Sequence, residues 1–198
     1  MKKSILKFLN AVAFSFVVIS LTTSCGSDEP SIIIEEPTSE VIKNLNSGVM
    51  NGSLNENFTL NASTIYNLNS SFIIESGVTL TIPAGTTIQA SNGGTDVYIA
   101  VLKGGKIDVQ GTESSPVLMS SASGKPGDWG GLTICGDATT TAGVDAQAEV
   151  GGFIYGGSND ADNSGAINYL VIKEPELKLM LILNTMEFLC MPLVLEPQ

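Results

Sequence analysis

The amino-acid sequence predicts an all-β solenoid, in which coils of short strands stack on one another. The first observation is alternation: at 78–82 and again at 107–110, apolar residues occupy every second position, which is typical of a strand with one buried face. The second observation is repetition, because Gly77 opens the first run and Gly105 opens the second. Similar runs repeated at a coil-sized interval indicate a parallel β-helix whose rungs cover one another.

Further strand-like runs lie on both sides of this repeat, separated by Asn, Ser and Gly residues that are typical of turns. The run at 97–102 is apolar throughout, which predicts a strand covered on both faces. Residues 138–152 are small and polar, and we expect them to loop out of the coil. No segment before Lys173 shows a helical period. The remaining strand-like runs are 54–60, 65–68, 72–74, 87–88, 117–119, 132–135, 153–155 and 167–172.

A β-sandwich is the alternative fold, because its strands also alternate between buried and exposed residues. Sandwich strands are joined by hairpins, which two-residue turns such as Asn-Gly signal. Asn51-Gly52 is the only such pair between plausible strands, whereas Asn92-Gly93 belongs to a wider loop. The scarcity of hairpin signals favours the solenoid.

The start of the chain has the features of a cleavable export signal, which we place at residues 1–24. Three lysines precede an apolar run at 8–21, and small residues then lead to Cys25. A cysteine after small residues resembles the lipobox of bacterial lipoproteins. The resemblance implies cleavage before Cys25 and lipidation of its thiol, so that the lipid would hold the chain at a membrane. An ordinary secretory signal with a chance cysteine is the alternative.

Residues 25–48 form the predicted tether between this anchor and the β-helix domain, which we place at 49–173. The first part of the tether is acidic and contains Pro30 and Pro37, a composition that favours a solvated linker. Serine followed by acids soon after Cys25 looks like an export signal to the outer face of the outer membrane. We therefore expect a surface-exposed outer-membrane lipoprotein, with the periplasmic face as the alternative location.

The charge balance excludes one class of partner. The 198 residues include 20 acids and nine lysines, with no arginine or histidine, and the formal net charge is −11. Such a chain is a poor match for phosphate backbones, so nucleic-acid binding is excluded. Without histidine the chain also lacks the commonest general base and the usual zinc ligand.

One motif could bind a cation. Asp160, Asp162 and Ser164 match the first half of a calcium loop, D-x-D-x-S-G-x-I, in which carboxylates at alternate positions converge on the ion. The closing glutamate of such a loop would fall at Val171. An Asx-rich turn between two strands is the alternative interpretation.

Trp129 is the candidate ligand-binding aromatic. It lies between Asp128 and two glycines, where an exposed indole could stack on a sugar ring. The alternative is structural, because a lone tryptophan beside glycines more often covers a corner or coil edge.

The signal for catalysis is weak. Glycosidic hydrolysis needs two carboxylates across one bond, and the spacing of the acids singles out no pair. The lysines near the predicted coil occupy corner-like positions. The acids considered are Asp108, Glu113 and Asp128, and the lysines are Lys103, Lys106 and Lys125.

Several motifs, in order along residues 54–172, together resemble a family of Bacteroidetes-type surface lipoproteins and secreted proteins. They read GVTLTIPAGTTI, KGGKIDVQGT, SPVLMSS, KPGDWGGLTICG and YGGSNDADNSGAINYLVI. The resemblance implies a right-handed parallel β-helix with more coils than this chain contains. It implies little about activity, because most members of that family have none established.

The composition changes after Lys173, where leucine and methionine replace valine, threonine and glycine. If the gene is read in a shifted frame that starts at the third base of the Lys178 codon, the possible codons permit the string INADTEYNGISLYAVGAGTT. This string has the turn glycines and β-forming residues of the preceding strands. We therefore hypothesise that residues 174–198 are frame-shifted and that the β-helix is incomplete at its C-terminal end. A genuine divergent tail is the alternative, and sequencing the locus distinguishes the two.

These features predict a lipid-anchored β-helix of the cell envelope that acts as a structural or binding module for glycans or a surface protein, rather than as an enzyme. A fragment of a carbohydrate-active enzyme, a polysaccharide lyase or hydrolase, is one alternative, and a truncated product without function is another. No cofactor is expected apart from calcium at the motif that contains Asp160.

Overall fold

The computed structural model describes residues 39–175 and 180–182. The predicted signal peptide, Cys25 and most of the predicted tether lie outside these residues. None of the helices in the described part is long and apolar enough to cross a membrane.

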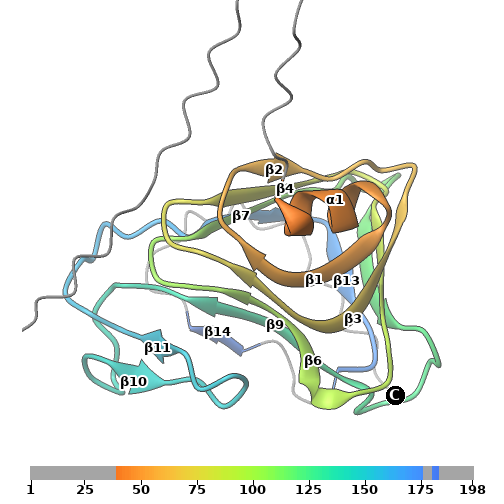
Figure 1. The fold of residues 1–198 in the computed structure, drawn as a ribbon. Coiled ribbons are helices and arrows are strands. Elements are labelled where there is room, and N and C mark those ends of the chain that lie inside the picture. Colours follow the sequence, from red (N-terminus) through yellow and green to blue (C-terminus); the bar gives the residue numbers. More distant parts are fainter. Residues whose placement is uncertain (1–38, 176–179, 183–198) are drawn as a thin grey trace, which may run out of the picture. The chain divides into compact units, whose positions relative to one another are not determined.

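The described chain winds into coils of parallel strands (Figure 1). An eight-stranded sheet has the order β13-β8-β5-β3-β6-β9-β14, with β1 beside β3, and a four-stranded sheet has the order β12-β7-β4-β2. Every ladder in these two sheets is parallel, so the expected parallel β-helix is confirmed over the hairpin-built sandwich. The strands are β1 (Val49–Leu54), β2 (Phe58–Thr59), β3 (Ile65–Ile74), β4 (Thr79–Pro83), β5 (Thr87–Ala90), β6 (Gly94–Val101), β7 (Lys106–Gln110), β8 (Val117–Ser121), β9 (Trp129–Cys135), β12 (Gly165–Asn168), β13 (Leu170–Ile172) and β14 (Met180–Ile182).

Strand β3 runs along two sides of the coil. Its first half pairs with β5, from Ile65 opposite Thr87, and its second half pairs with β6, from Phe72 opposite Ile99. The long sheet therefore forms two sides of the coil, one with β5, β8 and β13 and the other with β6, β9 and β14. The four-stranded sheet forms the third side.

The core lies inside the coil and is built from the alternating apolar residues. Leu80 on β4 pairs with Ile107 on β7, and Ile82 pairs with Val109 one step further along. All four side chains are fully buried. Because the strands are parallel and in register, like residues stack above like, and each coil covers the apolar surface of its neighbour.

A short helix, α1 (Glu40–Asn46), packs against this core and corrects the expectation that no helix precedes Lys173. Ser39 caps it by accepting a hydrogen bond from the Ile42 N–H (3.3 Å). Ile42 and Leu45 belong to the core, so the end of the predicted tether is packed rather than solvated. With two buried positions in seven residues, α1 is too short to show a helical period in the sequence.

One corner depends on the absence of a side chain. Gly165 opens β12 with φ +117°, and a Cβ at this position would lie 1.9 Å from the carbonyl oxygen of Ile107 on the neighbouring coil. Any other residue would force the two strands apart, so glycine is required here for the coils to stack.

Residues 136–164 leave the coil between β9 and β12, and we call this segment the excursion. It contains a small antiparallel sheet of β10 (Ala146–Gln147) and β11 (Ile154–Tyr155), which lies beside the coil in Figure 1. The expected loop at 138–152 falls within it. The expected burial of 97–102 is confirmed at Val97, Ile99, Ala100 and Val101, whereas Tyr98 and Leu102 are half-buried.

Part of the segment after Lys173 also joins the sheet. Met180–Ile182 pairs in parallel with Thr133 to Cys135 of β9, and Pro175 bridges to Trp129. The frame-shift hypothesis for residues 174–198 stays a prediction, and residues 183–198 lie outside the described part of the chain.

We expect Leu45→Ala to destabilise the domain by about 2–5 kcal/mol, because it removes a fully buried side chain from the contact between α1 and the first coil. Urea unfolding measures the change in the free energy of unfolding. The matched control is Lys43→Ala on the exposed side of the same helix, which should change that free energy by less than about 0.5 kcal/mol. Equal effects of the two substitutions would show that α1 does not contribute to the core.

Candidate functional site

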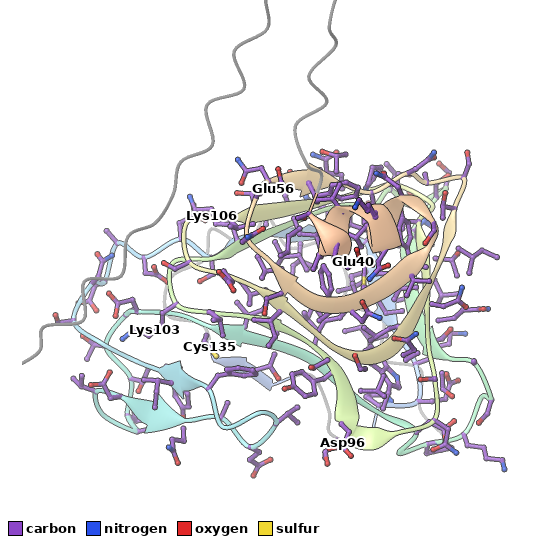
Figure 2. The ribbon with its side chains drawn as sticks, viewed as in Figure 1. Glu40, Glu56, Asp96, Lys103, Lys106 and Cys135 are labelled. Carbon is purple, nitrogen blue, oxygen red and sulfur yellow. The ribbon has the colours of Figure 1, made fainter. Side chains whose placement is uncertain are left out.

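Lys103 joins the coil to the excursion. It lies in the turn after β6, and its Nζ is 2.7 Å from Asp137 Oδ1 and 3.5 Å from Asp145 Oδ1. The same ammonium donates a hydrogen bond to the carbonyl oxygen of Gly156 (2.9 Å). Figure 2 shows Lys103 on the side of the coil where the excursion strands lie. One lysine therefore holds three separate points of the excursion.

This environment fixes the charge of the lysine. The hydrogen bond to Asp137 raises the pKa of Lys103 above 10.5, the charges of Asp137 and Asp145 raise it further, and partial burial opposes them. The ammonium therefore stays protonated at neutral pH. A protonated lysine cannot accept a proton, so Lys103 is poorly suited to be the base of an elimination reaction.

A second, smaller apolar cluster lies between the excursion and the outer face of β9. Cys135, Ala148 and Tyr155 are buried in it, and Phe153 packs against them. The Phe153 ring also meets Tyr98 of β6 edge to face, with centroids 5.9 Å apart and planes at 66°. All seven residues of β9 are buried because the core covers one face and the excursion covers the other.

The Cys135 thiol is unreactive in this position. It is free and fully buried, and desolvation raises its pKa to about 11. Because the thiolate is the reactive form, very little of it is present at neutral pH. Cys135 therefore acts as a small buried apolar residue of β9.

The predicted calcium ligands have other partners. Asp160 Oδ1 accepts a hydrogen bond from the Thr139 N–H (3.0 Å), and this bond lowers the pKa of Asp160. Asp162 Oδ2 accepts from the Asp137 N–H (3.1 Å) and from Ser164 Oγ (3.1 Å). Across residues 39–175 and 180–182, no three carboxylate or thiol side chains are grouped to hold a metal ion. Asp160 and Asp162 thus tie the two ends of the excursion together, as an Asx-rich turn would, and calcium binding at this motif stays a prediction.

The structure corrects the prediction that Trp129 binds a ligand through an exposed indole. Its side chain is fully buried in the core, and its indole N–H donates to the carbonyl oxygen of Lys173 (2.9 Å). An indole enclosed in this way has no exposed face on which a sugar could stack. The residue instead connects β9 to the chain segment that follows β13, in agreement with the structural interpretation.

Asp128, one of the acids considered for catalysis, stabilises the corner between β8 and β9. It is nearly buried, and its carboxylate accepts hydrogen bonds from the Ser121 and Ser123 hydroxyls. These bonds, Ser121 foremost, lower the pKa of Asp128. The Asp128 carbonyl oxygen accepts from the N–H groups of Gly93 and Gly94, so the residue also ties two coils together.

Asp108 differs from Asp128 because it faces outward from the four-stranded sheet. Gln110 Nε2 donates to its Oδ2 (2.7 Å), and Thr81 of β4 lies opposite it in the ladder. Half-buried or exposed polar side chains continue from it along β7 and onto β4, whereas Ala166 of β12 lies opposite it on the other side. We call this set the polar face: Thr79, Thr81, Lys106, Asp108, Gln110 and Asn168. Sequence reasoning used the alternation to find the core and did not use the intervening positions, which carry the signal for this face.

The third acid, Glu113, is exposed in the corner between β7 and β8, and Lys125 is exposed in the loop before β9. Neither approaches Lys103 or Asp108 through an ion pair or a hydrogen bond. The structure therefore brings together Lys103 with two acids of the excursion, and Asp108 with the polar face, as two separate polar sites.

We expect Lys103→Met to increase the rate of Cys135 labelling by a thiol reagent about two- to fivefold, because losing the ion pairs makes opening of the excursion easier. Peptide mapping by mass spectrometry reads the label on Cys135 in the full chain. Because the thiol reacts from the opened state, the labelling rate should also rise about tenfold per pH unit below the ordinary thiol pKa of about 8.5. Lys106→Met, on the polar face, is the control, and an equal rate in both variants would contradict the role of Lys103.

We expect Asp128→Asn to lower the stability at neutral pH, with a loss that shrinks as the pH falls below 3.8. The folded protein lowers the pKa of Asp128, so its contribution is present above the ordinary value of 3.8 and disappears as the carboxylate is protonated. Urea midpoints across this pH range measure the effect. Asp96→Asn, at an exposed acid, is the control, and a loss independent of pH would contradict this account.

Comparison with known proteins agrees with this geometry. A family model described as a pectate-lyase-like β-helix domain matches residues 52–177, which is more than half of the chain and runs from the middle of β1 past the end of β13. No curated protein and no solved structure gives a significant match. From its matched length and its parallel coils, the chain belongs to the family of pectate-lyase-like β-helix domains.

Proposed function

We propose that this protein is a lipid-anchored module of the cell envelope that binds glycans on the polar face of its β-helix. The observation that carries the proposal is the polar face itself. Thr79 lies opposite Lys106, Thr81 opposite Asp108, and Gln110 opposite Asn168 in the parallel ladders. Hydroxyl, carboxylate, amide and ammonium groups therefore repeat at the strand spacing of about 4.8 Å.

A repeating set of donors and acceptors suits a repeating ligand. A polysaccharide presents hydroxyl groups at regular intervals along an extended chain, and each could pair with a group on successive coils. Membership of a pectate-lyase-like family is consistent with a carbohydrate ligand. The excess of acids, 20 against nine lysines, favours neutral glycans over polyuronates, whose carboxylates it would repel.

A polysaccharide lyase or hydrolase is the second candidate, and the family description favours it. A lyase needs a base, and Lys103 is held protonated by Asp137 and Asp145. A hydrolase needs two facing carboxylates, whereas Asp128 is enclosed by Ser121 and Ser123. These occupied groups favour binding over cleavage.

The proposed location rests on the sequence alone. The apolar run at 8–21 and the small residues before Cys25 support export and lipidation, and the acidic stretch that follows supports transfer to the cell surface. Metabolic labelling with a fatty-acid probe tests the anchor, and loss of label in Cys25→Ser is the expected result.

We expect the purified full chain to bind one or more neutral polysaccharides, with Asp108→Ala weakening the affinity about tenfold through loss of a charged hydrogen-bonding group. Affinity electrophoresis against neutral and acidic polysaccharides, with and without calcium, measures binding. Gln89→Ala, on the outward side of β5, is the matched control and should bind like the unaltered protein.

The same incubations are assayed for new reducing ends and for unsaturated products. Binding without either product supports the module. Products of either kind would establish the enzyme instead, and binding that does not depend on Asp108 would remove the polar face from the proposal.

A further inference from the structure

The excursion is an addition that the solenoid does not need. At the same corner of the preceding coils, four residues suffice: 75–78 connect β3 to β4, and 102–105 connect β6 to β7. Between β9 and β12 the connection is residues 136–164. Insertions into one repeat of a solenoid project from one side, which is often the side that binds a partner.

The excursion is also held in one conformation. Its backbone is tied to itself by the hydrogen bond from the Ala148 N–H to the Phe153 carbonyl (2.8 Å) and to its own start by the bond from Gly156 N–H to Gly136 (2.9 Å). Lys103 and the cluster around Cys135 attach it to the coil. A preorganised surface loses less conformational entropy when it binds.

The outer surface of the excursion exposes apolar side chains. Val144 is 66% exposed and Ile154 is 40% exposed, and among the described residues only Ile65 is another large hydrophobic residue with comparable exposure. Ile154 precedes the buried Tyr155 on β11, and successive side chains of a strand point in opposite directions. Ile154 therefore points away from the coil, while Tyr155 points toward it.

The same surface is acidic. The excursion contains five carboxylates and no lysine. Lys103 pairs with Asp137 (2.7 Å) and, at 3.5 Å, with Asp145, which is itself exposed, and Glu149 and Asp160 are also exposed. An acidic surface with exposed apolar side chains is complementary to a basic polypeptide that carries apolar side chains of its own, and it repels anionic lipids and nucleic acids.

We propose that the outer surface of the excursion, centred on Val144 and Ile154, docks a basic, apolar-containing segment of a partner protein. Burial of the two side chains supplies affinity, and the surrounding carboxylates select for positive charge. This surface is separate from the polar face, so the proposal stands or falls independently of glycan binding.

Three synthetic peptides of equal length test the proposal against the purified full chain by fluorescence anisotropy. One alternates lysine and valine, the second alternates lysine and serine, and the third alternates glutamate and valine. We expect the lysine–valine peptide to bind most tightly. The double variant Val144→Ser with Ile154→Ser should weaken that binding about tenfold, because two apolar side chains are no longer buried.

Matched variants separate this surface from the rest of the acidic chain. Ile65→Ser removes the third exposed hydrophobic residue, on β3, and should leave peptide binding unchanged. Glu149→Lys should weaken binding more than Glu56→Lys, since Glu56 lies beside β2 and away from the excursion (Figure 2). All five substituted positions are exposed, so the variants should fold normally, and circular dichroism checks this.

Several results would overturn the proposal. Absence of binding would remove the docking site. Equal affinity for the lysine–valine and lysine–serine peptides would show that binding depends on charge alone. Equal losses of affinity in the Ile65 variant and the Val144/Ile154 variant would show that binding is not specific to the excursion. Self-association of the full chain in sedimentation equilibrium that disappears in the double variant would identify a second copy as the occupant instead.

Discussion

The stacking of inward-facing apolar side chains from one coil to the next is the constraint on which the remaining structure depends. Leu80 above Ile107 and Ile82 above Val109 illustrate it, since each residue is buried only because its partner strand is in register. A slip by one residue would turn this set outward and bring polar side chains into the core. The parallel ladders and the glycine at position 165, where a Cβ would meet the neighbouring strand, preserve that register.

The outward positions are free to differ because the inward positions carry the stability. On the four-stranded sheet they form the polar face around Asp108. On the side of β6 and β9 the excursion packs against outward residues such as Cys135 and Tyr98. One scaffold therefore presents two chemically different surfaces, one suited to hydrogen-bonding ligands and one that displays Val144 and Ile154 with acids around them.

Much of the fold could be predicted from the sequence, because alternation between glycine corners is a local signal that the coil repeats. Helix α1 could not be predicted from the sequence, because seven residues carry too little helical periodicity. Its contribution to the core follows only from the packing of Leu45 in the structure. The candidate sites could be predicted less well from the sequence than the fold. Whether Trp129 faces solvent, or Asp160 faces a cation, depends on contacts with residues far along the chain, such as Lys173 and Thr139. A short motif does not contain that information.

Helix α1 also has a consequence for the order in which the molecule can assemble. It packs against the first coil, and it belongs to the earliest part of the described domain to leave the ribosome. Later strands pair with strands made shortly before them, as Ile99 does with Phe72 and Lys106 with Thr79. Each newly synthesised rung can therefore pack on a rung that has already folded, and the domain can fold from its N-terminal end toward its C-terminal end during translation.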